Sequence, residues 1–434
     1  MRTIAMAARP ESKFLKKLAV LLTMLLAITT ILSHVASAQA VVVGGAGGAY
    51  YKFAVPANWN GDLILWNPGL GEVPIAPFVI DPAAPLAGLS WEQPLFSLAP
   101  LQFSEGFALA TSTRSENGWA VFRSNADLKS MMDAFINQFG VPKRIFVNGR
   151  SFGGLVAIDA IESANLGNVV GGFSMCGILA GSRTWDAALD LRLIYDTVCS
   201  AVAPIPGGAE GLPPHFNVTS EQIAGAVNQC TGVLLPAALR TPEQQQRLTK
   251  ILTVTGLPEN FILNDMVFAT SIMSDLVHVK LHGIGTGNLR VDYGDDLINS
   301  TIARVSPDPD AQRLLADNYT PSGITRHARI LSLHTNKDGL ALIENETDYS
   351  SKVAARNFSL AVALEEIPSH CGFSPAEITA GWESLSAWVA GAPQPNAASI
   401  LGACQQTTAF GIPGPCRFDP GFVLPDVDGR LRPR

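Results

Sequence analysis

The chain has 434 residues, which is long for one average domain and short for three at roughly 100–200 residues per domain. Hydrophobic residues make up 47% and charged residues only 15%, a balance that excludes a disordered or highly solvated chain. The net charge of −7 offers no basic surface to a nucleic acid, so we expect no nucleic-acid partner.

The first 38 residues have the pattern of a secretory signal peptide. Five basic residues precede an apolar run over 18–32, and Ala36-Ser37-Ala38 supplies the small residues of a cleavage site. The run is short for a membrane span, which needs about 20 residues, although an uncleaved anchor is the alternative. We expect a secreted or periplasmic protein, cleaved near Ala38, with no stable membrane insertion after the signal is removed. Removal would change the net charge from −7 to −11.

All six cysteines follow this leader, and an even number in an exported chain favours disulfides, up to three of them. No two cysteines have C-x-x-C spacing, so we expect neither a zinc site nor a redox motif.

Strand-like and helix-like segments alternate after the leader. Apolar or β-branched runs predict strands over 41–55 (with a bend at the glycines of 44–48), 62–66, 106–111, 144–147 and 169–175. Apolar residues at three- and four-residue spacing predict helices over 125–139 and 152–163. This alternation argues for a mostly parallel sheet flanked by helices.

The alternation then stops and later resumes. Residues 185–327 have a helical pattern, with a capping box at Thr241-Pro242-Glu243-Gln244, a helix end at Gly256 and a longer apolar stretch over 261–282. Strands are expected again over 329–333 and 358–364, and a helix over 375–389. We therefore predict one α/β core from 41–184 and 328–390, a helical cap insertion over 185–327 and a Pro/Gly-rich tail over 391–434.

The motif Gly149-Arg150-Ser151-Phe152-Gly153 fits G-x-S-x-G between a predicted strand and a predicted helix. A strand-to-helix elbow needs small residues on both sides of a strained nucleophile, so that the hydroxyl stands clear of the backbone. Ser151 is therefore the candidate nucleophile. The N–H of Phe152 would lie at a helix N-terminus, where it can stabilise an oxyanion.

A serine nucleophile needs a general base, and the base needs an orienting acid. His370 follows the last predicted strand, and Asp338 lies in the turn after the strand over 329–333. The chain order Ser151, Asp338, His370 is the order that G-x-S-x-G hydrolases use. All three side chains would meet above the carboxyl ends of the strands.

Other residues compete for these roles. His334 could be the base, and a second set could be the acid: Asp348, Glu365 and Glu366. His278 and His282 are four residues apart with Asp275 one turn earlier, so they could share a helix face as metal ligands, but packing is the better explanation and we expect no metal. Arg150 could pair with a carboxylate or face the substrate.

The second oxyanion donor should come from the loop after the strand over 62–66. That loop reads Asn67-Pro68-Gly69-Leu70-Gly71. Pro68 has no N–H, so Gly69 or Leu70 must donate, and Leu70 is preferred.

On these motifs, the sequence resembles the α/β-hydrolase superfamily from about residue 50 to 390. The insertion falls where that superfamily usually carries a cap. The resemblance implies a serine hydrolase with an acyl-enzyme intermediate and no cofactor, acting most often on esters. The usual His-Gly before the oxyanion loop is replaced here by Asn67-Pro68-Gly69.

His370-Cys371 also resembles the His-Cys pair of tannases and feruloyl esterases, in which this cysteine bonds to one just before the nucleophile. Arg150 occupies that position here, so this bridge cannot form. Cys371 would have to pair elsewhere, with Cys176 as the first choice, and Cys199–Cys230 and Cys404–Cys416 would complete one of fifteen possible pairings.

The leading hypothesis is thus a secreted serine esterase that acts on a small-molecule or polymeric ester. An exopeptidase or amidase on the same fold is the alternative. It would need a carboxylate in the insertion to bind a free N-terminus, and Asp265, Asp275 and Glu259 are available. A non-catalytic binding module is the third possibility.

Overall fold

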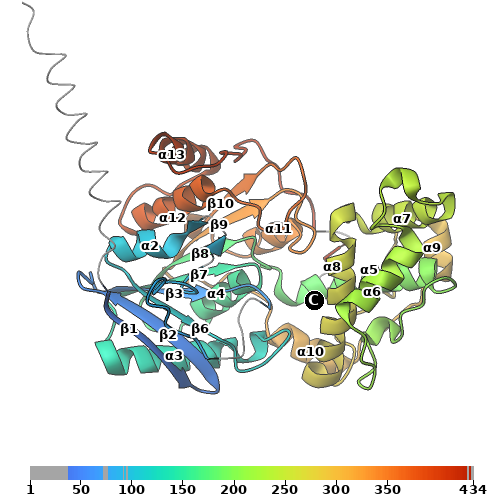
Figure 1. Cartoon of the computed structure of the whole chain (residues 1–434), viewed down its shortest axis with the longest axis horizontal. Helices are drawn as coiled ribbons and strands as arrows, with labels where there is room; N and C mark the ends of the chain where they lie inside the picture. The colour runs from blue at the N-terminus through green and yellow to red at the C-terminus, as the bar shows by residue number, and fades with distance from the viewer. Residues whose placement is uncertain (1–37, 72–76, 91, 94–95, 428–429, 432–434) are drawn as a thin grey trace, which may run out of the picture.

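The computed structural model describes residues 38–71, 77–90, 92–93, 96–427 and 430–431 (Figure 1). Apart from Ala38, the expected signal peptide lies outside these residues. An α/β body and a lobe of helices lie side by side along the longest axis of the molecule (Figure 1).

Eight strands form one sheet in the order β1-β2-β6-β3-β7-β8-β9-β10. Their bounds are β1 Ala38–Ala46, β2 Ala49–Pro56, β3 Asp62–Asn67, β6 Ala108–Ser112, β7 Arg144–Arg150, β8 Val169–Met175, β9 Arg329–Thr335 and β10 Phe358–Ala363. β2 is antiparallel to both of its neighbours, and the run from β6 to β10 is parallel. The sheet expected from the sequence is therefore confirmed. A separate hairpin joins β4 Glu92–Gln93 to β5 Phe96–Ser97.

Alternation along the strands gives the sheet two apolar faces. Leu63 and Leu65 of β3 face the cluster that contains helices α3 and α4, whereas Ile64 and Trp66 face the cluster that contains α2, α12 and α13. These helices are α2 Leu98–Ser104, α3 Val121–Phe139, α4 Phe152–Ser163, α12 Pro375–Val389 and α13 Ala397–Ala409. Because both faces are covered, the central strands are buried, as parallel strands require.

Two predicted boundaries differ from the structure. α3 begins at Val121, four residues before the predicted start, because Val121 is itself buried and no side chain caps the helix to mark its beginning. β6 begins two residues after the predicted Gly106, whose φ of 87° places it in a turn.

The chain between β8 and β9 carries the helices of the second lobe (Figure 1). These are α5 Thr184–Cys199, α6 Ser220–Thr231, α7 Pro242–Thr255, α8 Ile262–Val267, α9 Asp296–Thr301 and α10 Pro309–Asp317. We call this segment, residues 184–317, the helical insertion. The predicted capping box is confirmed, because the Thr241 side chain accepts from the Gln244 N–H and Gly256 ends α7 with a φ of 66°.

The apolar stretch predicted over 261–282 is not one regular α-helix. α8 is followed by two π-helical stretches, Phe268–Ile272 and Asp275–Leu281, and His282 ends the run with a φ of 53°. The continuous run Glu259–Leu281 is long and apolar enough to cross a membrane by length and composition alone. Part of it is buried against the rest of the helical insertion, so this property is weak evidence for a membrane span.

The Pro/Gly-rich segment after Gly391 contains a regular helix, α13, which packs on α12. The Pro/Gly-rich composition of this segment gives no sign of a helix. Asn396 caps the helix through the Ser399 N–H, and Ile400 and Cys404 form its buried face. α11 Glu344–Ser350 precedes β10 and closes the set of helices around the sheet.

Candidate active site

Ser151 lies at a sharp turn between β7 and α4, with φ 54° and ψ −125°. A Cβ on Gly149 would lie 1.9 Å from the carbonyl oxygen of Gly153, and a Cβ on Gly153 would lie 1.9 Å from that of Asn67. Only glycine fits at either position. The G-x-S-x-G motif is thus a steric requirement of the turn, which holds a non-glycine residue in a sparsely populated conformation.

His370 lies between Ser151 and Asp338. Its Nε2 is 2.8 Å from the Ser151 Oγ, and its Nδ1 is 2.8 Å from Oδ2 and 3.0 Å from Oδ1 of Asp338. The three side chains come from separate loops, after β7, β9 and β10. The structure therefore brings the three predicted residues together in the connectivity of a nucleophile, a base and an orienting acid.

Asp338 is buried and well supplied with hydrogen bonds. Its Oδ1 accepts from the N–H groups of Leu340 and Ala341 at 3.0 Å each, and its Oδ2 accepts from the Cys371 N–H at 3.2 Å. Burial alone would raise the pKa of Asp338, but the charge and hydrogen bond of His370 and the other donors bring it below its usual value. The carboxylate form is therefore favoured.

The competing bases and acids lie elsewhere. His334 is fully buried with its Nδ1 against the Thr335 carbonyl, and burial lowers its pKa, which keeps it neutral. The competing acids do not face His370: Asp348 pairs with Arg183 and Lys352, Glu365 accepts from Ser369, and Glu366 is exposed.

Arg150 is near enough to the triad for its charge to matter. Burial lowers its pKa to about 10, and the charge of Asp338 opposes this shift.

Among the described residues, one group has ligand atoms that converge as in a metal site: Cys176, Asp338, His370 and Cys371. The two sulfurs are bonded to each other, and the other two residues form the hydrogen-bonded pair above. His278, His282 and Asp275 do not form such a group.

Three disulfides join the six cysteines: Cys176–Cys371, Cys199–Cys230 and Cys404–Cys416. These are the pairings chosen from the sequence. The first links the residue after β8 to the residue after His370, across a sequence separation of 195. Because the Cys371 N–H also donates a hydrogen bond to the Asp338 carboxylate, the loop that carries His370 is held by this bond and by the disulfide.

The expected oxyanion donors belong to two separate segments. Phe152 is the first residue of α4, and the loop residues Gly69 and Leu70 line the same cavity as Ser151. Arg114, which sequence reasoning missed, contacts both segments. It donates to the carbonyls of Pro68 and Gly69, and its guanidinium lies 4.5 Å from the centroid of the Phe152 ring.

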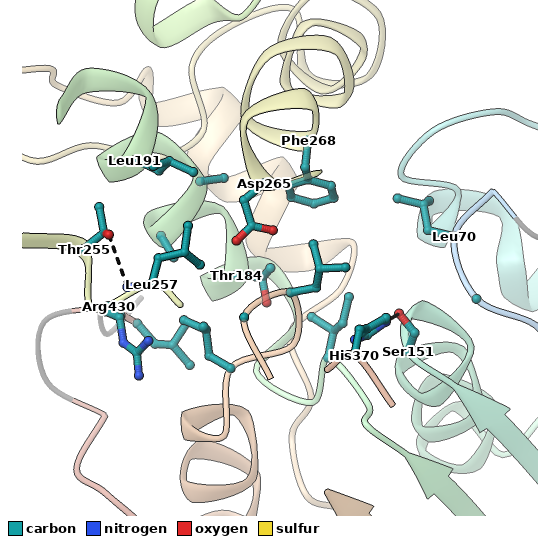
Figure 2. A pocket seen from close by; sticks show the side chains of 18 residues that line it. Leu70, Ser151, Thr184, Leu191, Thr255, Leu257, Asp265, Phe268, His370 and Arg430 are labelled. Carbon is teal, nitrogen blue, oxygen red and sulfur yellow. Dashed lines mark hydrogen bonds between the residues drawn. The ribbon is translucent and has the colours of Figure 1, made fainter. Parts of the chain in front are cut away.

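A cavity of about 200 Å³ opens from Ser151 and His370 into the helical insertion (Figure 2). Its other lining residues are mostly apolar: Gly69, Leu70, Ile178, Thr184, Ala187, Ala188, Leu191, Thr255, Leu257, Asp265, Phe268, Gly339, Leu340, Leu342, Arg430 and Leu431. Enclosed, apolar cavities with a few polar groups are typical of small-molecule sites.

The contribution of the C-terminal tail to the cavity wall was not predicted. Arg430 and Leu431 come from the C-terminal tail, where Leu431 is buried beside Ala180 and Leu342 and Arg430 pairs with Glu344. Of the three carboxylates that an exopeptidase could use, Asp265 lines the cavity, whereas Glu259 pairs with Arg240 and Asp275 lies against Gly118.

No protein-family model and no curated protein matches the sequence. The fold is similar to solved structures of low identity. Candida antarctica lipase A in its closed state is 14% identical with a TM-score of 0.40, over 85% of this chain and 86% of that one. A Pyrococcus furiosus esterase is 11% identical with a TM-score of 0.37, over 81% and 88%. A rice cell wall degrading esterase, LipA, from Xanthomonas oryzae is 12% identical with a TM-score of 0.36, over 79% and 84%. At these scores the similarity says nothing about substrate.

Proposed function

We propose that this chain, which has the α/β-hydrolase fold, is a serine hydrolase that cleaves carboxylic esters through an acyl-enzyme intermediate. The observation that carries the proposal is the hydrogen-bonded connection Ser151–His370–Asp338 at the mouth of an apolar cavity.

Each residue has a defined part in the reaction. The Ser151 Oγ attacks the ester carbonyl carbon while His370 Nε2 takes its proton, and Asp338 holds the imidazole through Nδ1. The N–H groups of Phe152 and Leu70 stabilise the developing oxyanion. The intermediate expels the alcohol, which takes the proton from His370, and leaves an acyl group on Ser151. Water, deprotonated by His370, then releases the acid and restores the serine.

The helical insertion has the part of a cap in this proposal, because much of the apolar cavity wall comes from it: Ala187, Ala188 and Leu191 of α5, Leu257 after α7 and Phe268 after α8. Secretion fits the three disulfides, which form in oxidising compartments.

Hydrolysis of 4-nitrophenyl acetate and butyrate by the wild type and Ser151→Ala tests the proposal. Loss of the nucleophile should lower kcat by several orders of magnitude, on the order of 10⁶-fold when serine acts as in a full triad. Equal rates would exclude the mechanism. Labelling of Ser151, but not of Ser151→Ala, by a fluorophosphonate probe would separate an enzyme from a binding module.

An exopeptidase remains the second candidate, and the position of Asp265 in the cavity wall is the observation that favours it. Their substrates distinguish an esterase from an exopeptidase. An esterase hydrolyses simple acyl esters much faster than aminoacyl-4-nitroanilides, whereas an exopeptidase requires the free amino group.

A further inference from the structure

One acidic side chain projects into the cavity away from the triad. Figure 2 shows the Asp265 carboxylate pointing from α8 into the space between Leu257, Thr184 and Phe268. The residue is partly accessible and belongs to the cavity lining. Any substrate that fills the cavity from Ser151 would therefore meet Asp265.

Asp265 has no hydrogen-bond or ion-pair partner in the part of the chain that the structure describes. Arg430, the arginine among the described residues that line the cavity, is paired with Glu344. A carboxylate that is largely withdrawn from water and has no partner is energetically unfavourable, so its position in an apolar wall indicates a functional role.

The surroundings of Asp265 indicate what kind of partner is missing. Burial is the main cause that raises its pKa well above the usual value, and the charge of Asp338 raises it further. The charge of Asp338 thus adds to the negative potential at Asp265, and no cationic group of the described residues is an electrostatic partner of Asp265 itself. A ligand with a positive charge would relieve both effects, whereas an anionic ligand would be repelled.

We propose that Asp265 forms a cation subsite that binds a positively charged nitrogen of the substrate while Ser151 attacks its ester bond. The substrates are then esters that carry an amino or quaternary ammonium group in the part that occupies the cavity. This inference rests on the proposed ester hydrolysis and adds the substrate class.

Pairs of esters that differ only in charge test it. On the acyl side, the 4-nitrophenyl esters of 4-(trimethylammonio)butyrate and 5,5-dimethylhexanoate have the same shape. On the alcohol side, butyrylcholine and 3,3-dimethylbutyl butyrate form the same kind of pair. In at least one pair, wild type should show kcat/KM about tenfold or more higher for the cationic ester, and Asp265→Asn should bring the ratio close to one.

Asp265→Asn removes a buried charge and keeps the shape of the side chain, so it should fold at least as stably as wild type. Asp275→Asn is the matched control, because Asp275 belongs to the same helical run but does not line the cavity, and it should keep the wild-type ratio.

The results distinguish a failure of the cation subsite from a failure of the proposed ester hydrolysis. If wild type cleaves the neutral ester of both pairs as fast as the cationic one, or if Asp265→Asn keeps the preference, the cation subsite is wrong while ester hydrolysis stands. If wild type cleaves none of the four esters and no simple ester, the proposed function itself fails.

Discussion

Arg114 donates a hydrogen bond of 3.1 Å to the carbonyl oxygen of Gly69, and this carbonyl belongs to the same peptide unit as the N–H of Leu70. In a trans peptide the C=O and the N–H point in opposite directions. Arg114 therefore holds the Leu70 N–H away from itself, and Leu70 lines the cavity that Ser151 also lines. The bond also polarises the peptide, which would strengthen the Leu70 N–H in its proposed part as an oxyanion donor.

Arg114→Lys should lower kcat for 4-nitrophenyl butyrate about 10²-fold and change KM little, because the loss of one oxyanion donor acts on the transition state. Lysine keeps the charge but not the planar fork that reaches two carbonyls. Steady-state kinetics check this split between kcat and KM.

Arg144→Lys is the matched control, since Arg144 pairs with Asp62 at the opposite end of β7 from Ser151. It should leave kcat unchanged. A higher KM with unchanged kcat in Arg114→Lys would show that Arg114 shapes the binding site rather than the oxyanion loop.

Asp338→Asn should lower kcat on the order of 10⁴-fold, the loss that this change causes in a serine-protease triad. The amide cannot stabilise the imidazolium and favours the wrong tautomer of His370. Glu366→Gln, at an exposed acid after the same strand as His370, should have full activity. Comparable rates for Asp338→Asn and wild type would assign the acid to another residue.

The double variant Cys176→Ala/Cys371→Ala should lower kcat by about tenfold to a hundredfold while the protein is still folded. The bridge fixes the residue next to His370, and small displacements of a catalytic group are costly. Cys404→Ala/Cys416→Ala, which opens a bridge between α13 and the segment after it, should lower stability and keep kcat. Activity at 25 °C and thermal unfolding of both variants distinguish these effects, and an equal loss of kcat in both would contradict the special position of Cys371.

The buried carboxyl group of Glu346 should make the free energy of unfolding fall as the pH rises. It is fully buried with one hydrogen bond, from Ser332, and burial raises its pKa from 4.5 to about 8. Between these values the unfolded chain binds fewer protons than the folded one. The free energy of unfolding therefore falls as pH rises, by up to about 1.4 kcal/mol per pH unit from this group.

Glu346→Gln keeps the hydrogen bond from Ser332 and removes the proton equilibrium. Urea unfolding at pH 5 and pH 8 should show a smaller difference in the variant than in wild type. The same pH dependence in both proteins would mean that Glu346 is charged in the folded state.

Sequence reasoning could predict features that depend on local pattern and chain order. The elbow at Ser151, the strands before Asp338 and His370 and the capping box at Thr241 all follow from residue types at fixed spacing. Features that depend on tertiary contact could not be predicted. Arg114 is 45 residues from Gly69 along the chain, and no pattern links them. Composition likewise hid α13, whose helix depends on burial against α12.

The helical insertion and the sheet face under α4 share one hydrophobic cluster, which runs from Leu155 through Trp185 to Ile262 without a break. Such a continuous core couples the two parts thermodynamically, so neither unfolds at low cost while the other stays intact. Heat or denaturant should therefore abolish enzyme turnover and the far-ultraviolet helical signal at the same midpoint. Substitutions in the part of the helical insertion that lines the cavity should therefore also affect the hydrophobic core that holds Ser151.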